Sequence, residues 1–182
     1  MQNSWSSYEA NQLIRVLTSY NDSVSSKDTA CLAKRKLKSS PSRGGMFEKL
    51  VASIKEKVDL NENDIETLKP FFIPKKVRKR QYVLNAGDVC QYITFVEKGM
   101  LRSFTVDIEG HEHVVQFAIE GWWVSDVGSF VSGTDALYNI EALEDCELLH
   151  LTKVAMDELL MKLPVMERFF RLLMQNNIVA LQ

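Results

Sequence analysis

Apolar residues between positions 47 and 58 recur every three or four positions, as they do on one face of an α-helix. They are Phe47, Leu50, Val51, Ile54 and Val58. Asn61 then occupies a typical N-cap position, and Glu62 and Asp64 follow where negative charge favours the start of a helix. The pattern therefore predicts two consecutive helices, the second of which ends at Pro70.

The middle of the sequence changes to short segments rich in β-branched and aromatic residues. The predicted strands are Tyr82–Leu84, Tyr92–Val96, Met100–Val106, His113–Ile119, Tyr138–Leu143 and Cys146–Leu151. Gly87, Gly99 and Gly110 lie in the turns between them, where a positive φ is accessible to glycine at little cost. Short strands joined by such turns predict an antiparallel sandwich or barrel.

Helical spacing returns at the end of the chain. Thr152 is a suitable N-cap for a helix over Val154–Leu163, and Pro164 opens a last helix. That helix carries apolar positions at the 4-3-4-3 spacing of a coiled-coil seam, with one polar residue that would fix register. The predicted dimer seam consists of Val165, Phe169, Leu172, Asn176 and Val179. A second apolar row (Met166, Phe170 and Leu173) favours a homodimer over the alternative of a plain packing helix, because two rows need two neighbours.

The first 45 residues differ from the rest in composition. They are rich in Ser and contain seven Lys or Arg against three acidic residues, which gives this segment a net charge of +4. Since the whole chain has a net charge of −2, the remaining residues have a net charge of −6. We expect a disordered basic extension over 1–45, because it cannot bury enough apolar area to offset its ordering entropy. Lys34–Lys38 could bind nucleic acid or simply be a solvated tail. A barrel domain is expected over 46–164, and the helix over 165–182 reaches Gln182 without a stop signal, which predicts a truncated dimerisation helix.

Composition narrows the cellular setting. Cys31, Cys90 and Cys146 are odd in number and form no CxxC motif, which argues against a disulfide framework or a zinc site. No apolar run is long enough to span a bilayer, and no signal peptide precedes the first helix. We therefore expect a cytoplasmic protein without membrane contact.

Three local motifs occur in a distinctive order. Lys79–Asp88 runs from a strand into a Gly-Asp turn, Tyr92–Arg102 contains a strand, a Gly turn and a second strand, and Asp107–Glu112 forms the next hairpin. Together they resemble the cyclic nucleotide-binding domain of Crp/Fnr-type transcription regulators, in a style common in Bacteroidetes. The resemblance implies a mainly β fold with flanking helices: a double-stranded β-helix (a jelly-roll, cupin-like barrel) with N-terminal helices and a C-terminal dimerisation helix. It also implies that DNA would be contacted only through a C-terminal helix-turn-helix domain absent from this sequence.

The same resemblance locates a ligand pocket. Its candidate residues are Trp123, Ser125, Asp126, Val127, Gly128, Ala136 and Leu137. Ser125 and Asp126 match the family's Gly-Glu pair, which meets a ribose hydroxyl, whereas Ala136 and Leu137 match the Arg and Ser/Thr that clamp the cyclic phosphate. Residues 121–137 contain no Lys, Arg or His, and a buried phosphate needs a cation or several donors. We therefore expect no cofactor and no binding of cyclic AMP in the usual way, and a small-molecule effector that is neutral, apolar or cationic.

Two alternatives remain open at this stage. One is a stand-alone interaction module with a degenerate pocket. The other is a cupin-like metal protein that uses His111 and His113, which would share one face of a strand but lack an evident third ligand. No nucleophile elbow, phosphate loop or other catalytic motif occurs, so we expect neither an enzyme nor a metal site.

Overall fold

The computed structural model describes residues 45–179, with side chains as far as residue 172. Its helices are α3 (Glu48–Lys55), α4 (Glu62–Leu68), the 3₁₀ helix η1 (Lys69–Phe71), α5 (Val127–Ser132), α6 (Lys153–Lys162) and α7 (Pro164–Val179). Its strands are β1 (Ile73–Val77), β2 (Tyr82–Leu84), β3 (Tyr92–Lys98), β4 (Met100–Val106), β5 (Glu112–Ile119), β6 (Trp123–Val124), β7 (Asn139–Ala142) and β8 (Cys146–Thr152). The predicted extension over 1–45 lies outside these residues apart from Gly45.

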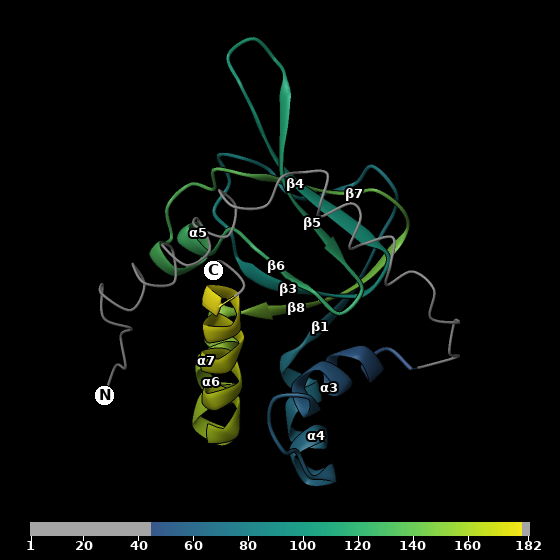
Figure 1. Cartoon of the computed structure of the whole chain (residues 1–182), viewed down its shortest axis with the longest axis vertical. Helices are drawn as coiled ribbons and strands as arrows, with labels where there is room; N and C mark the ends of the chain where they lie inside the picture. Colours follow the sequence, from purple (N-terminus) through teal and green to yellow (C-terminus); the bar gives the residue numbers. More distant parts are fainter. Residues whose placement is uncertain (1–44, 180–182) are drawn as a thin grey trace.

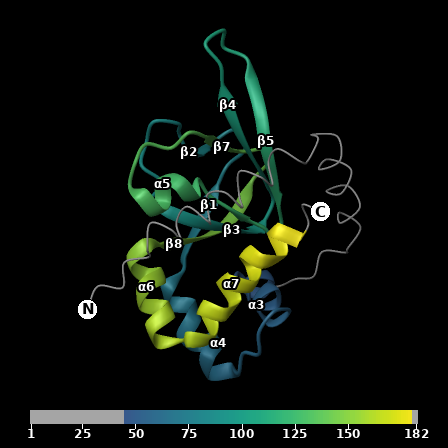
Figure 2. The same ribbon diagram turned by 60° about the vertical axis from the view of Figure 1, so that its left-hand side comes forward.

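Two antiparallel four-stranded sheets form the barrel (Figure 1). One sheet, called sheet A here, has the strand order β1-β8-β3-β6, and the other, sheet B, has the order β2-β7-β4-β5. Helix α5 lies at one end of the barrel, while α3, α4, α6 and α7 gather beside sheet A (Figures 1 and 2). The mainly β jelly-roll fold with flanking helices, predicted from the sequence, is confirmed.

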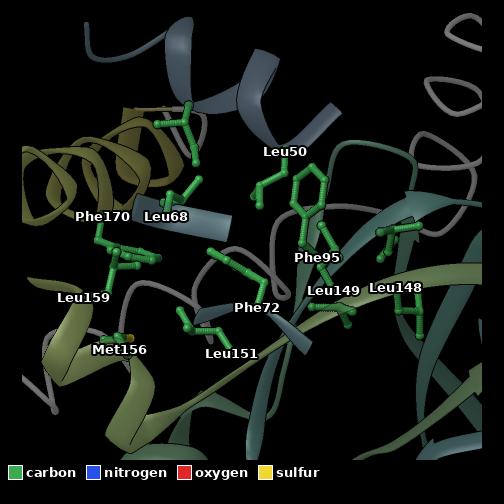
Figure 3. Close-up of a cluster of buried hydrophobic side chains, with 14 of the residues drawn as sticks. Leu50, Leu68, Phe72, Phe95, Leu148, Leu149, Leu151, Met156, Leu159 and Phe170 are labelled. Carbon is green, nitrogen blue, oxygen red and sulfur yellow. The ribbon is translucent and has the colours of Figure 1, made fainter. Parts of the chain in front are cut away.

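The central strands of sheet A, β3 and β8, are buried on both faces. Phe95 pairs with Trp123 and Leu149 across neighbouring strands, so these three side chains share the face that the helices cover. Figure 3 shows Phe95, Leu149 and Leu151 of the sheet facing Leu50, Leu68, Leu159 and Phe170 of the helices. Val96 and Leu148 alternate to the opposite face and point into the barrel. Water is excluded from both faces of these strands, so their buried polar side chains, Thr94, Glu97 and His150, each have a hydrogen-bond partner within the protein.

A buried carboxylate attaches the first helix to this sheet. Glu97 of β3 is 6% exposed, and its two oxygens accept hydrogen bonds from the backbone N–H groups of Lys49 (2.6 Å) and Leu50 (3.1 Å). These N–H groups lie in the first turn of α3, where a helix has no internal acceptors. Burial raises the pKa of Glu97, while the two N–H donors act in the opposite direction.

The predicted capping residues of the later helices are confirmed. Asn61 accepts from the backbone N–H of Asp64, whose own side chain accepts from Asn61, which completes a capping box for α4. Thr152 accepts from the backbone N–H of Ala155 at the start of α6. Pro70 lies inside η1 and not at a sharp stop, because the chain tightens into a 3₁₀ turn before β1.

Two strands were not predicted. β1 has the sequence IPKKV, in which Pro74 and two lysines obscure any apolar alternation. Such residues suit an edge strand, and β1 is the outer strand of sheet A. β6 is only two residues long, which is too short for a periodic signal. The other six predicted strands are confirmed with their ends shifted by one or two residues at most.

The predicted seam needs one correction. Phe169 is fully buried within the chain, and with Phe170 it packs against Trp123 of sheet A. It therefore belongs to the core of the domain and not to a seam exposed on α7. Val165 and Leu172 are half-buried, and the side chains of Asn176 and Val179 lie outside the described part of the chain. Among residues 45–179, no helix has the length and apolar character that crossing a bilayer would demand.

Gly99, in the turn between β3 and β4, is required for two reasons. Its φ is +95°, and a Cβ atom added there would lie 2.6 Å from Cys146 Sγ and 3.0 Å from the carbonyl oxygen of Asp145. Gly110, in the β4–β5 turn, has a similar φ of +88° but no heavy atom within 4 Å of an added Cβ. The two positions therefore separate backbone strain from steric contact.

We predict that Gly110→Ala lowers the free energy of unfolding by about 1 kcal/mol, the cost of a left-handed alanine. Gly99→Ala should cost at least about 2 kcal/mol more, because the β7–β8 turn must also move. Urea unfolding of both variants measures the difference. Equal losses in the free energy of unfolding would show that the contact between the added methyl group and Cys146 does not destabilise the domain.

Candidate functional site

Asp126 organises the segment that connects β6 to the rest of the barrel. It is 4% exposed and is the N-cap of α5. One carboxylate oxygen accepts from the backbone N–H of Ser129 (3.0 Å), and the other accepts from the backbone N–H of Leu137 (2.8 Å). A single side chain thus fixes the start of α5 and the loop that follows it. Both of its oxygens thus have a backbone donor within the protein, which holds the carboxylate in place.

The loop after α5 is attached to the turn that follows β2. Ala136 is buried; its carbonyl accepts from the N–H of Gly87, and its N–H donates to the carbonyl of Asp88, both at 2.9 Å. Val89 and Asp135 form an isolated antiparallel bridge beside this pair. Leu137, by contrast, points outward and is 71% exposed. The two positions predicted to face a ligand therefore diverge.

A buried cluster of small polar side chains lies beneath α5. Ser129 donates to the carbonyl of Thr134 (2.6 Å) and accepts from the N–H of Cys90 (2.8 Å). Ser125 donates to the carbonyl of Tyr92, and its oxygen lies 3.3 Å from the Cys90 sulfur. These contacts join α5 to the start of β3. No pattern in the sequence indicated that Ser129 and Cys90 would meet, because 39 residues separate them.

Polar residues also occur on the inner face of the barrel. Ser103 of β4 pairs with Gln116 and Ile140, so it shares the inner face with Leu101 and Ala142. On the opposite sheet, Thr94 Oγ1 and His150 Nδ1 are hydrogen-bonded at 2.9 Å. His150 is 7% exposed and stacks on the ring of Tyr92 at a centroid distance of 4.8 Å. Burial, helped by the positive charge of Lys75, lowers the pKa of His150 to about 4, so the imidazole is neutral at pH 7.

Positive charge is scarce around α5. The side chain of Lys153, the first residue of α6, donates to the carbonyl of Val131 (2.7 Å) at the C-terminal end of α5. Arg102 projects from the outer face of sheet B, where it forms ion pairs with Glu141 (2.6 Å) and Glu112 (2.7 Å). The described site therefore consists of a carboxylate, hydroxyls, a thiol and a neutral imidazole. Such a lining can hydrogen-bond a neutral molecule but does little to compensate a phosphate.

Comparison with known proteins identifies the domain type. Residues 74–162, which include all eight strands except the first residue of β1 and also α5 and α6, match the cyclic nucleotide-binding domain family. Over these residues the chain is similar to a cyclic nucleotide-binding domain. Among curated relatives, it is 26% identical over 122 residues to the fumarate and nitrate reduction regulatory protein of Vibrio cholerae, covering 65% of this chain and 47% of that protein. It is also 26% identical over 126 residues to an anaerobic regulatory protein of Pasteurella multocida, covering 65% and 43%.

Solved structures share the fold of this cyclic nucleotide-binding domain. The catabolite activator protein of Thermus thermophilus has a TM-score of 0.58 at 20% identity, covering 66% of this chain and 56% of that one. The sensor domain of the transcriptional regulator DNR from Pseudomonas aeruginosa has a TM-score of 0.57 at 15% identity, covering 71% and 87%. The chain spans about half the length of the curated relatives that it matches.

One predicted pocket residue is wrong. Trp123 packs against Phe95 and against Phe169 and Phe170 of α7, on the face of sheet A opposite to the inside of the barrel. Its indole Nε1 is buried and has no hydrogen-bond partner among the described residues. Ser125, Asp126 and Ala136 do come together beneath α5, and Val127 and Gly128 form its half-buried first turn.

A separate open groove of about 580 Å³ lies between η1 and α6, lined in part by Phe71, Val154 and Lys162.

His111 and His113 lie at the exposed end of the β4–β5 hairpin. Asp107 contacts both imidazoles, at 2.8 Å from His113 Nε2 and 3.4 Å from His111 Nδ1. The hydrogen bond with His113 is the largest of the effects that lower the pKa of Asp107 to about 2. Among the residues with described positions, no group of three or more His, Cys, Asp or Glu is placed to hold a metal ion. Asp107 instead closes the hairpin turn by accepting from the N–H groups of Glu109 and His111.

We predict that Asp126→Ala frees the loop that follows α5. Loss of the N-cap and of the bond to Leu137 should lower the free energy of unfolding by about 2 kcal/mol. Amide hydrogen exchange at Ser129 and Leu137 should accelerate together. Asp135→Ala, which removes an exposed carboxylate from the same loop, is the matched control. Unchanged exchange at Leu137 would rule out the proposed role of Asp126.

His150 should make stability depend on pH. Its pKa is about 4 in the folded domain and near 6.5 when unfolded, so only the unfolded chain takes up this proton between those values. The stabilisation is complete above pH 6.5, decreases as pH falls and is lost by about pH 4, with a total on the order of 3 kcal/mol. In His150→Gln, the free energy of unfolding measured with urea should vary less with pH over this range. His111 and His113 are present in both proteins, so the difference between the two pH profiles reports on His150. Parallel profiles would contradict the prediction.

Proposed function

We propose that this chain is the effector-sensing domain of a Crp/Fnr-type transcription regulator, and that its pocket accepts an uncharged effector in place of a cyclic nucleotide. The match to the cyclic nucleotide-binding domain family supports the first part of the proposal, as does the similarity to a fumarate and nitrate reduction regulatory protein and to an anaerobic regulatory protein. The second part rests on one observation: residues 121–137 supply a buried carboxylate, Asp126, and no Lys, Arg or His to compensate a phosphate.

The electrostatics of the site support the proposed class of effector. A cyclic phosphate that enters the barrel below α5 would meet the carboxylate of Asp126 and no cation from residues 121–137. The inner face offers Ser103 and Gln116 as neutral hydrogen-bonding groups. A neutral molecule could use these groups without the desolvation penalty of a buried anion.

The contacts of α5 suggest how binding would be transmitted. Lys153 connects the end of α5 to α6, and α6 packs against α7. An effector that displaces α5 would therefore bias the positions of α6 and α7. In the proposed full-length regulator, this would alter the dimer and the spacing of two DNA-reading domains. We propose that Val165, Leu172, Asn176 and Val179 face the partner, while Phe169 stays in the core of each copy.

We predict that the chain shows no saturable binding of cyclic AMP or cyclic GMP up to about 1 mM, because no group in the pocket compensates the phosphate. Isothermal titration calorimetry on residues 1–182 tests this directly. Saturable binding in the micromolar range would overturn the argument from the pocket.

A gain-of-function variant supplies the positive control. Ala136→Arg combined with Leu137→Ser restores the residues that the family resemblance assigns to these positions, and it should produce measurable heat with cyclic AMP. Circular dichroism establishes that the variant is folded before titration. Uncharged metabolites can then be screened by thermal shift against the original chain and Ser103→Ala. A metabolite that raises the melting temperature of both proteins equally would indicate binding that does not involve Ser103, outside the inner face of the barrel.

A further inference from the structure

Five cations lie close together on the edge of sheet A and the corner that follows it. They are Lys75, Lys76, Arg78, Lys79 and Arg80, all exposed, and they are called the basic corner here. Lys76 forms an ion pair with Glu147 at 3.4 Å. Within the part of the chain that the structure describes, the other four have no acidic side chain at ion-pair distance. Residues 46–182 carry a net negative charge, so this concentration of positive charge stands apart from the rest of the domain.

The backbone holds the basic corner in a fixed shape. The N–H of Lys79 donates to Asp145 Oδ1 (2.9 Å), and the N–H of Arg80 donates to the carbonyl of Ala142 (2.7 Å). Gln81 closes the turn through its bonds with Arg78. Arg80 has a φ of +66° and is the only non-glycine residue with positive φ among the described residues. Glycine or asparagine would adopt this conformation at lower cost, so Arg80 places its guanidinium at a position where the backbone conformation is unfavourable for it.

The extent of the basic corner indicates the kind of anion that it fits. Lys75 and Lys76 lie on β1, and Arg78, Lys79 and Arg80 lie in the turn that follows it, so five cations surround one end of the strand, more than a single phosphate would need. Duplex DNA presents a phosphate about every 1.7 Å along its axis, so a cluster of five cations can meet several phosphates at once. Between Lys75 and Arg80 the only apolar side chain, Val77, is buried. Ile73 and Tyr82 flank the corner and are about half exposed, but among its five cations the surface has no apolar or aromatic centre of the kind that a protein interface contains.

We propose that the basic corner is a contact surface for the phosphate backbone of nucleic acid. It would hold flanking DNA without reading its sequence, since it consists only of flexible cations and fixed backbone. The surface lies on the edge strand and is separate from the pocket beneath α5. The inference therefore goes beyond the proposed effector site, and failure of one leaves the other intact.

The test is fluorescence anisotropy of a labelled random-sequence duplex titrated with the full chain at low salt. We expect Arg78→Ala/Lys79→Ala/Arg80→Ala to weaken binding at least tenfold and to reduce the slope of log K against log salt by about 2 to 3. Lys34→Ala/Arg35→Ala/Lys36→Ala is the matched control, because it removes the same charge from the N-terminal segment. It should retain the salt slope of the original chain.

A second variant separates binding from folding. Arg80→Gly relieves the strained conformation and removes one cation, so it should raise the melting temperature while it weakens duplex binding. Three results would overturn the proposal: no duplex binding by the original chain, equal losses in both triple variants, or equally tight binding of polyglutamate at the same ionic strength. The cations would then serve only to keep the edge of β1 from pairing with other chains.

Discussion

The central strands β3 and β8 carry apolar side chains on both faces, so water has to be excluded from each face of sheet A. Sheet B and α5 cover one face, and helices from both ends of the described chain cover the other. The helices that precede the barrel in the sequence and those that follow it thus pack on the same face of sheet A. Glu97 strengthens this arrangement, because it satisfies two N–H groups at the start of α3 from within the sheet. The barrel and its flanking helices share one hydrophobic core for this reason.

The requirement also determines what α7 can do. Met166, Phe169 and Phe170 cover sheet A within a single copy, so this part of the helix is committed to its own domain. Because α7 is packed on sheet A, it can transmit movement of the barrel more directly than a helix without such contacts. The buried contacts of α7 and the link between Lys153 and Val131 lie along one path from α5. The same contacts that stabilise the domain would thus carry a signal through it.

Local signals in the sequence predicted much of this fold because they depend on local physics. Asn61 and Thr152 cap helices, and Gly99 and Gly110 form turns, wherever the chain goes next. Position 169 shows where such reasoning stops. A 4-3 spacing reveals an apolar stripe but not its neighbour, and the neighbour proved to be sheet A. Trp123 illustrates the same limit, since alternation on a two-residue strand does not say which face is the inside. Asp126 was predicted as a pocket residue, yet its bond to Leu137 depends on how the loop after α5 folds back.

Trp123 has a consequence for how the domain can be observed. Its indole ring joins β6 to Phe169 and Phe170, and its buried N–H has no acceptor within the part of the chain that the structure describes. Indole fluorescence shifts to longer wavelength when the ring meets water or a new polar neighbour. Any displacement of the last helix would expose this ring or give its N–H a partner. The domain therefore contains an intrinsic optical reporter of where that helix lies, placed at the junction through which a bound effector would act.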